Sequence, residues 1–136
     1  KDGLNWLNEG VALKKEGANL NGAAVVKVGE RWTMAVNVDG EKLFLASSAN
    51  GRVFAMGNEI SGITSASSHF AKMGAIYNLY YCKDGIVNTS TVDGKTWMGS
   101  AIDIESGSKE VICDPSVEPL VDGSFVMYFK KQVAQP

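Results

Sequence analysis

The chain has 136 residues, enough for one hydrophobic core but not for two, and we expect residues 1–136 to form a single domain. Apolar residues make up 45% and charged residues 21%, and no apolar run approaches the roughly 18 residues of a membrane span. The formal net charge is -2 without a basic stripe, so we expect neither a nucleic-acid nor a membrane partner.

A short turn pattern occurs three times along the chain: Asp or Asn, Gly, two variable residues and an aromatic residue. It stands at residues 2–6 (DGLNW), 50–54 (NGRVF) and 93–97 (DGKTW), and a hydroxyl residue precedes the two later copies by two positions. Glycine accepts a positive φ, and the Asp or Asn oxygen binds nearby backbone N–H groups. We therefore interpret the turn as structural, with its aromatic residue packed between neighbouring sheets.

Short strand-like runs recur in phase with this turn, and two glycines make residues 10–20 a loop rather than a helix. In chain order, we expect strands at 23–28, 32–36, 42–47, 69–73, 77–81, 86–90, 116–121 and 125–129. Repeats of about 40 to 50 residues are typical of propellers. The sequence therefore predicts an all-β propeller segment made of three four-stranded blades.

The two ends of the chain divide one blade between them. The chain begins at a lysine inside the first turn and stops after the second strand of the third unit. If Pro136 is notionally joined to Lys1, the spacing of the turns continues in register. We therefore expect the chain to hold a whole number of repeats. Propellers have about four to eight blades, so three should not close alone. We expect either part of a longer, processed or excised propeller, or a homodimer that forms a six-bladed ring with two-fold symmetry.

The two cysteines, Cys82 and Cys113, lack the paired spacing of a zinc site. Cysteine is among the most buried residue types, which favours two free buried thiols over a disulfide. We expect no metal and no cofactor.

Residues 113–129 (CDPSVEPLVDGSFVMYF) resemble a blade opening of the five-bladed glycoside hydrolases and related glycosidase-like propellers. The turn at 93–97 is similar to the S-x-D-G-x-x-W turn of those proteins, a relative of the sialidase Asp-box. The resemblance implies a carbohydrate ligand in an axial cleft and an extracellular or periplasmic location. These motifs are blade signatures, so they leave hydrolysis of glycosidic bonds open.

In those hydrolases the Asp of the D-P blade opening often is a catalytic carboxylate, which points to Asp114 here. Hydrolysis needs two carboxylates roughly 5 to 9.5 Å apart. A gapless alignment of the units matches Asp114 with Asn21 and Ala66, neither of which is acidic. The alternative is a structural Asp that accepts backbone hydrogen bonds at the strand start.

Four further residues are candidates for the site. Glu110, in the loop before the expected strand, is a second candidate acid, and Glu118 shares one strand face with Asp114 if the side chains alternate. Asn21 and Glu118 are candidate ligand-binding residues. The single histidine, His69, stands at the entry to an inner strand, where it either binds a ligand or makes a structural hydrogen bond.

The sequence thus supports two functional interpretations. One is a glycosidase-like propeller unit that binds carbohydrate and hydrolyses it with Asp114. The other is a non-catalytic propeller that binds a glycan or a protein, or serves as an assembly scaffold.

Overall fold

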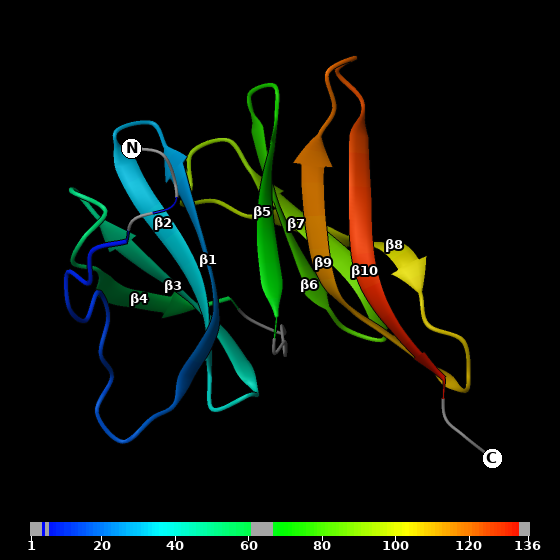
Figure 1. The fold of residues 1–136 in the computed structure, drawn as a ribbon, viewed down its shortest axis with the longest axis horizontal. Coiled ribbons are helices and arrows are strands. Elements are labelled where there is room, and N and C mark those ends of the chain that lie inside the picture. The colour runs from blue at the N-terminus through cyan, green and yellow to red at the C-terminus, as the bar shows by residue number, and fades with distance from the viewer. Residues whose placement is uncertain (1–3, 5, 61–66, 134–136) are drawn as a thin grey trace.

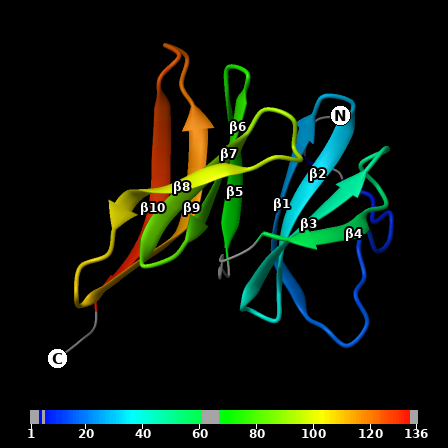
Figure 2. The same ribbon diagram turned by 180° about the vertical axis from the view of Figure 1, so that it is seen from behind.

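The chain folds into three antiparallel β-sheets that follow one another along the chain (Figures 1 and 2). The computed structural model describes residue 4 and residues 6–60 and 67–133, and all regular structure within them is β-strand. These residues include no helix that is long and apolar enough to cross a membrane. The all-β fold class that the sequence predicts is confirmed.

Each of the first two sheets has four strands in sequence order, and the third sheet has two. The strands are β1 (Leu20–Val28), β2 (Arg31–Val38), β3 (Lys42–Ser48) and β4 (Ala55–Glu59); β5 (Ser68–Met73), β6 (Ile76–Cys82), β7 (Gly85–Thr91) and β8 (Met98–Glu105); and β9 (Glu110–Pro119) and β10 (Phe125–Val133).

All eight expected strands overlap observed ones. The first strand of the third unit, which we expected at 116–121, differs in its bounds. It begins at Glu110, and Leu120 and Val121 belong to the turn that follows it. The turns at 50–54 and 93–97 lie where the repeat places them, whereas the turn at 2–6 falls largely outside the described residues.

The turn at 50–54 is held by two side-chain oxygens. Ser48 Oγ accepts hydrogen bonds from the backbone N–H groups of Asn50 and Gly51 at 3.2 and 3.0 Å. Asn50 Oδ1 in turn accepts from the N–H groups of Arg52 and Val53 at 2.9 and 3.2 Å. The two oxygens satisfy four N–H groups that have no strand partner, which explains the residue types of the repeat.

The turn at 93–97 repeats this bonding with a carboxylate. Thr91 Oγ1 accepts from the N–H groups of Asp93 and Gly94 at 3.3 and 2.9 Å. Asp93 Oδ1 accepts from the N–H groups of Lys95 and Thr96, both at 2.8 Å. The backbone hydrogen bonds from Thr96 and Lys95 lower the pKa of Asp93 to about 2.

Neighbouring sheets pack face to face, and the aromatic residue of the turn at 93–97 contributes to this packing. Trp97 lies in the core shared by the first two sheets, with its ring centroid 6.1 Å from that of Phe70. Leu43 and Leu79, from the two sheets, are fully buried in the same core. The predicted position of this aromatic residue between sheets is confirmed.

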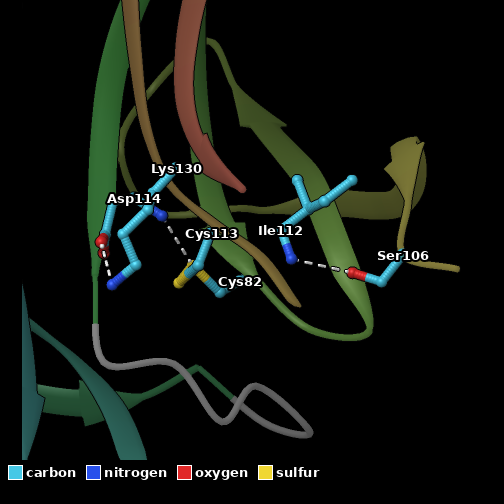
Figure 3. Close-up of a disulfide and its surroundings, with 6 residues drawn as sticks. All are labelled: Cys82, Ser106, Ile112, Cys113, Asp114 and Lys130. Carbon is cyan, nitrogen blue, oxygen red and sulfur yellow. Dashed lines mark hydrogen bonds and ion pairs between the residues drawn. A yellow bond between two sulfur atoms is a disulfide. The ribbon is translucent and has the colours of Figure 1, made fainter. Parts of the chain in front are cut away.

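The two cysteines form a disulfide (Figure 3), so the prediction of two free thiols is wrong. Cys82 ends β6 in the second sheet, and Cys113 lies in β9 of the third. Their Cα atoms are 5.2 Å apart, within the range that a disulfide bridges. Burial tendency alone misled the prediction because the proximity arises from packing between two sheets.

The contact between Gly51 and Trp32 gives a testable prediction. Gly51 has φ +74°, and a Cβ there would lie 2.9 Å from Trp32 Cε2; Gly74 has φ +64° with nothing within 4 Å of such a Cβ, and Gly99 has neither restriction. We expect Gly74→Ala to cost about 1–2 kcal/mol of unfolding free energy, Gly51→Ala more, and Gly99→Ala least. Urea unfolding measures all three; equal losses for Gly51→Ala and Gly74→Ala would contradict the packing of Trp32 on this turn.

The carboxylate turn gives a second prediction, on acid stability. The pKa of Asp93 is about 2 in the folded chain against an ordinary value of 3.8. The contribution of its carboxylate to the free energy of unfolding is therefore present above about pH 4 and is lost as the pH falls towards about 2. An amide is the natural residue in the equivalent turn, at Asn50. We therefore expect Asp93→Asn to reduce the loss of stability between pH 4 and pH 2.

Urea midpoints at pH 7, 4 and 2 test this prediction. Asp93→Ala is the matched control, because it removes the acceptor oxygen and should lower stability already at pH 7. An acid-induced loss of the same size in Asp93→Asn and in the unmodified chain would contradict the role of this carboxylate.

Candidate functional site

The first strands of the three sheets lie side by side and run in the same direction (Figure 1). β1 contacts β5, and β5 contacts β9. Two side-chain hydrogen bonds join them: Ser68 Oγ donates to the Gly22 carbonyl at 3.3 Å, and His69 Nε2 donates to the Val117 carbonyl at 3.1 Å. Asn21, His69 and Asp114 thus lie on three neighbouring strands, at or towards the ends where the chain enters them.

Asp114 occupies a β-bulge in β9. Cys113 pairs with Lys130 and Ser116 with Tyr128, so two residues of β9, Asp114 and Pro115, oppose one residue of β10. Asp114 has a left-handed backbone, with φ 55°. Proline lacks an N–H group and is tolerated within a sheet at such a bulge.

The first sheet has an equivalent bulge, which corrects the gapless alignment. Asn21 pairs with Asn37 and Ala24 with Ala35, and Gly22 at the bulge has φ 58°. Gly22, rather than Asn21, is therefore the structural counterpart of Asp114. Ala66, the counterpart expected in the second unit, lies outside the described residues.

The error in the alignment is one residue and comes from the hairpin turns. Pro119 pairs with Phe125 in the third sheet, and Lys27 pairs with Trp32 in the first. The connection between the paired residues is one residue longer in the third sheet. A gapless alignment through these turns therefore shifts the inner strand by one position.

The Asp114 carboxylate is half-exposed and ion-paired. Its Oδ2 lies 3.2 Å from Lys130 Nζ on β10 (Figure 3), and 47% of its side chain is accessible. Two other non-glycine residues described have a positive φ, Asp39 and Asp84, and both lie in tight hairpin turns. Asp114 differs from them because it adopts this conformation inside a strand.

The two glutamates lie elsewhere than expected. Glu110 is the first residue of β9, not a loop residue, and is ion-paired to Lys131 at 2.6 Å. Glu118 is exposed and lies beyond the bulge, opposite Val126. Because the bulge interrupts the alternation of side chains, a shared face for Asp114 and Glu118 no longer follows from strand geometry.

The two remaining candidates have clear local environments. His69 is half-buried, and its hydrogen bond to a carbonyl places a proton on Nε2, which is the structural role weighed from the sequence. Asn21 is exposed and borders a largely apolar cavity of about 230 Å³ that Leu13, Met34 and Val36 also line. A ligand-binding role for either residue stays a prediction.

Two larger cavities do not include Asp114 among their lining residues. One of about 460 Å³ is lined by the disulfide, Asp84 and Glu110. Another of about 450 Å³ lies between the first sheet and the turn at 93–97, and its lining includes the charged residues Arg31 and Asp93. None of these three cavities combines Asp114 with a second carboxylate.

The donor set at Asp114 does not suit a metal ion. The sulfur atoms of Cys82 and Cys113 lie within 4.8 Å of each other and of an Asp114 carboxylate oxygen. Both sulfurs are in the disulfide and offer no thiolate. The arrangement instead presents one carboxylate that can accept hydrogen bonds.

Sequence reasoning missed two structural features beside Asp114, the disulfide and the Lys130 ion pair. Lys130 approaches Asp114 because it pairs with Cys113, the residue before the bulge. The Asp-Pro sequence lies just before the strand expected at 116–121, and it was the available signal for the bulge once that strand is extended to Glu110, because proline in a strand marks an edge or a bulge.

No family model matches the chain, and no curated protein matches it by sequence. Solved structures do match its fold. A GH43 endo-arabinanase from Bacillus licheniformis has a TM-score of 0.62 at 18% identity, over 79% of this chain and 46% of that chain. The arabinanase Arb43A from Bacillus subtilis has a TM-score of 0.63 at 16% identity, over 82% of this chain and 48% of that chain.

An exo-β-1,3-galactanase from Phanerochaete chrysosporium also matches, with a TM-score of 0.59 at 11% identity over 82% of this chain and 32% of that chain. The chain therefore spans less than half the length of each of these enzymes. At these identities the likeness concerns the fold alone. The chain has the fold of a partial β-propeller, similar to part of the five-bladed propellers of these GH43 enzymes.

Proposed function

We propose that the chain is a carbohydrate-binding unit of a glycosidase-like propeller, with Asp114 contacting the sugar near the entry end of β9. The propeller fold and the place of Asp114 on an innermost strand support this proposal. The observation that carries it is the conformation of Asp114.

A left-handed conformation is unfavourable for a residue with a Cβ, and a residue before proline ordinarily adopts an extended conformation. The equivalent bulge in β1 uses Gly22 at nearly the same φ. The bulge therefore does not require a carboxylate, and Asp114 is retained there at an energetic cost. Such strain persists where the surrounding structure enforces it and is concentrated at functional sites.

The carboxylate has an oxygen available for a ligand. Lys130 contacts Oδ2, and none of the hydrogen bonds found within the described residues uses Asp114 Oδ1. An ionised carboxylate only accepts hydrogen bonds, and sugar hydroxyl groups donate them. Oδ1 is therefore positioned to accept from a sugar hydroxyl.

Hydrolysis is the further part of this proposal, with Asp114 as the base or the orienting carboxylate. It requires a second carboxylate roughly 5 to 9.5 Å away. Glu110 is ion-paired to Lys131. We therefore assign the role of the general acid to Glu110 only if that ion pair opens, and otherwise to a carboxylate of the blades that complete the ring. The non-catalytic alternative, a glycan- or protein-binding propeller or a scaffold, is favoured by Gly22, which gives Asp114 no acidic counterpart.

Substituting Asp114 tests the proposed function. We expect Asp114→Asn and Asp114→Gly to fold, because asparagine adopts a left-handed backbone as readily as aspartate and glycine adopts it without strain. Binding of arabino-oligosaccharides or β-1,3-galactotriose, measured calorimetrically, should weaken by at least about tenfold, the effect of losing a charged hydrogen bond. Release of reducing sugar from the same ligands distinguishes hydrolysis from binding alone.

Asp39→Asn is the matched control. Asp39 also has a positive φ, and its Oδ1 accepts the Asn19 N–H, a bond that an amide oxygen preserves. This variant should bind sugar as the unmodified chain does. Unchanged binding and turnover in both Asp114 variants would remove Asp114 from the site.

We also propose that further strands complete the third sheet, either from a second copy of this chain or from additional blades. Within the described residues, no strand pairs with the outer edge of β10. Tyr128 and Val133 on β10 are 64% and 60% exposed, and Trp6 near the other end is 89% exposed. An unpaired apolar edge invites pairing with another strand.

The disulfide is typical of the oxidising compartments, extracellular or periplasmic, that the resemblance implies.

Light scattering tests this completion. We expect the isolated chain to self-associate with increasing concentration and Tyr128→Lys to reduce this association, because a charge on an exposed edge opposes strand pairing. Val53→Lys, which alters an equally exposed side chain in a turn, is the control. A stable monomer at all concentrations would contradict both forms of the proposal.

A further inference from the structure

We propose that the Cys82–Cys113 disulfide is a positioning device for Asp114, which holds the bulge of β9 in the conformation that presents the carboxylate. The reason for positioning Asp114, contact with a sugar, rests on the proposed function. The positioning itself can be measured without a ligand.

One of the two cysteines of the disulfide, Cys113, is the residue directly before the bulge. Cys113 precedes Asp114 directly, and Pro115 follows it and is buried. A covalent bond to the second sheet fixes the backbone before Asp114, and the proline ring restricts φ immediately after it. Asp114 therefore lies between two restrained residues, which leaves little freedom for its own backbone to relax.

The same disulfide also binds the Asp114 backbone. The Asp114 N–H donates to Cys82 Sγ at 3.2 Å (Figure 3). A bulge disrupts the regular ladder and leaves its extra residue unpaired, and here a sulfur atom takes the place of the strand acceptor. Cys82 therefore holds Asp114 by a covalent path through Cys113 and by a direct hydrogen bond.

The register on the other side of the bulge places the charge partner. Cys113 pairs with Lys130, and Lys130 Nζ contacts Asp114 Oδ2. Fixing Cys113 against the second sheet thus also fixes the strand position from which Lys130 reaches the carboxylate. Both the backbone and the side chain of Asp114 depend on this one residue.

Comparison of the two bulges distinguishes a disulfide that positions Asp114 from one that only attaches the third sheet to the second. Gly22 adopts the same conformation without a Cβ, and its bulge has no cross-link. The cross-link lies at the bulge whose residue is strained. A disulfide that served only to attach the third sheet could lie anywhere along β9, and its removal would loosen the whole strand.

The first experiment reads the backbone of Asp114 in the full chain by nuclear magnetic resonance. It compares the unmodified chain with the Cys82→Ala/Cys113→Ala variant and with the unmodified chain reduced by a trialkylphosphine, which needs no substitution. We expect the Asp114 chemical shifts to leave the left-handed range and its amide to exchange at least about tenfold faster. The amide of Phe70, in the core of the first two sheets, should keep its protection and shows that the chain remains folded.

Two results would overturn the proposal. One is an Asp114 that keeps its left-handed shifts after both the substitution and the reduction. The other is faster exchange along all of β9 and β10, Val117 included, because that pattern identifies a staple for the third sheet rather than a device for one residue.

The second experiment separates this inference from the proposed function, with β-1,3-galactotriose and arabino-oligosaccharides as probes. Removing the cross-link should weaken binding about tenfold when Asp114 is present and have little effect on the residual affinity of Asp114→Gly, as expected for coupled residues. Binding that depends on Asp114 but is unaffected by loss of the cross-link contradicts the positioning role alone. A chain that binds neither probe contradicts the proposed function, and the chemical shifts then decide the positioning role.

Discussion

A β-sheet with two apolar faces must be covered on both of them, and the rest of this structure follows from that constraint. Successive residues of β6 illustrate it: Leu79 and Tyr81 are buried against the first sheet, and Tyr80 is buried against the third. In β7, Val87 is buried against the first sheet and Ile86 against the third. Because adjacent side chains point to opposite faces, such runs need a neighbouring sheet on each side.

This constraint also explains which parts of the fold the sequence predicts. The turns are local, since Ser48 and Asn50 satisfy backbone groups within a few residues, and the apolar runs between them give the strands. The bulge and the disulfide are not local. The alignment matched Asp114 with Asn21 instead of Gly22 because one hairpin turn is a residue longer than the other. The cysteines were expected to be free because their proximity comes from the contact of β9 with the second sheet.

The repeats are informative in two different ways. Asn50 and Asp93 differ in charge but make the same hydrogen bonds to their turns, so the difference between them has no effect on the local structure. Gly22 and Asp114 also share a backbone conformation, but here the residue that fits without strain is replaced by one that does not. A difference that costs stability without changing the fold points to a role outside the fold.

The third sheet carries both Asp114 and the open edge of β10, so its completion and the candidate site are physically coupled. Lys130 and Lys131 are adjacent on β10, and each forms an ion pair with an acidic residue of β9, Asp114 and Glu110 respectively. Any strand or blade that covers β10 changes the solvent around both ion pairs and strengthens their electrostatics by excluding water. Under the proposed positioning role, the disulfide holds the Asp114 backbone in one conformation whether or not β10 is covered, so the carboxylate keeps the same position in both states.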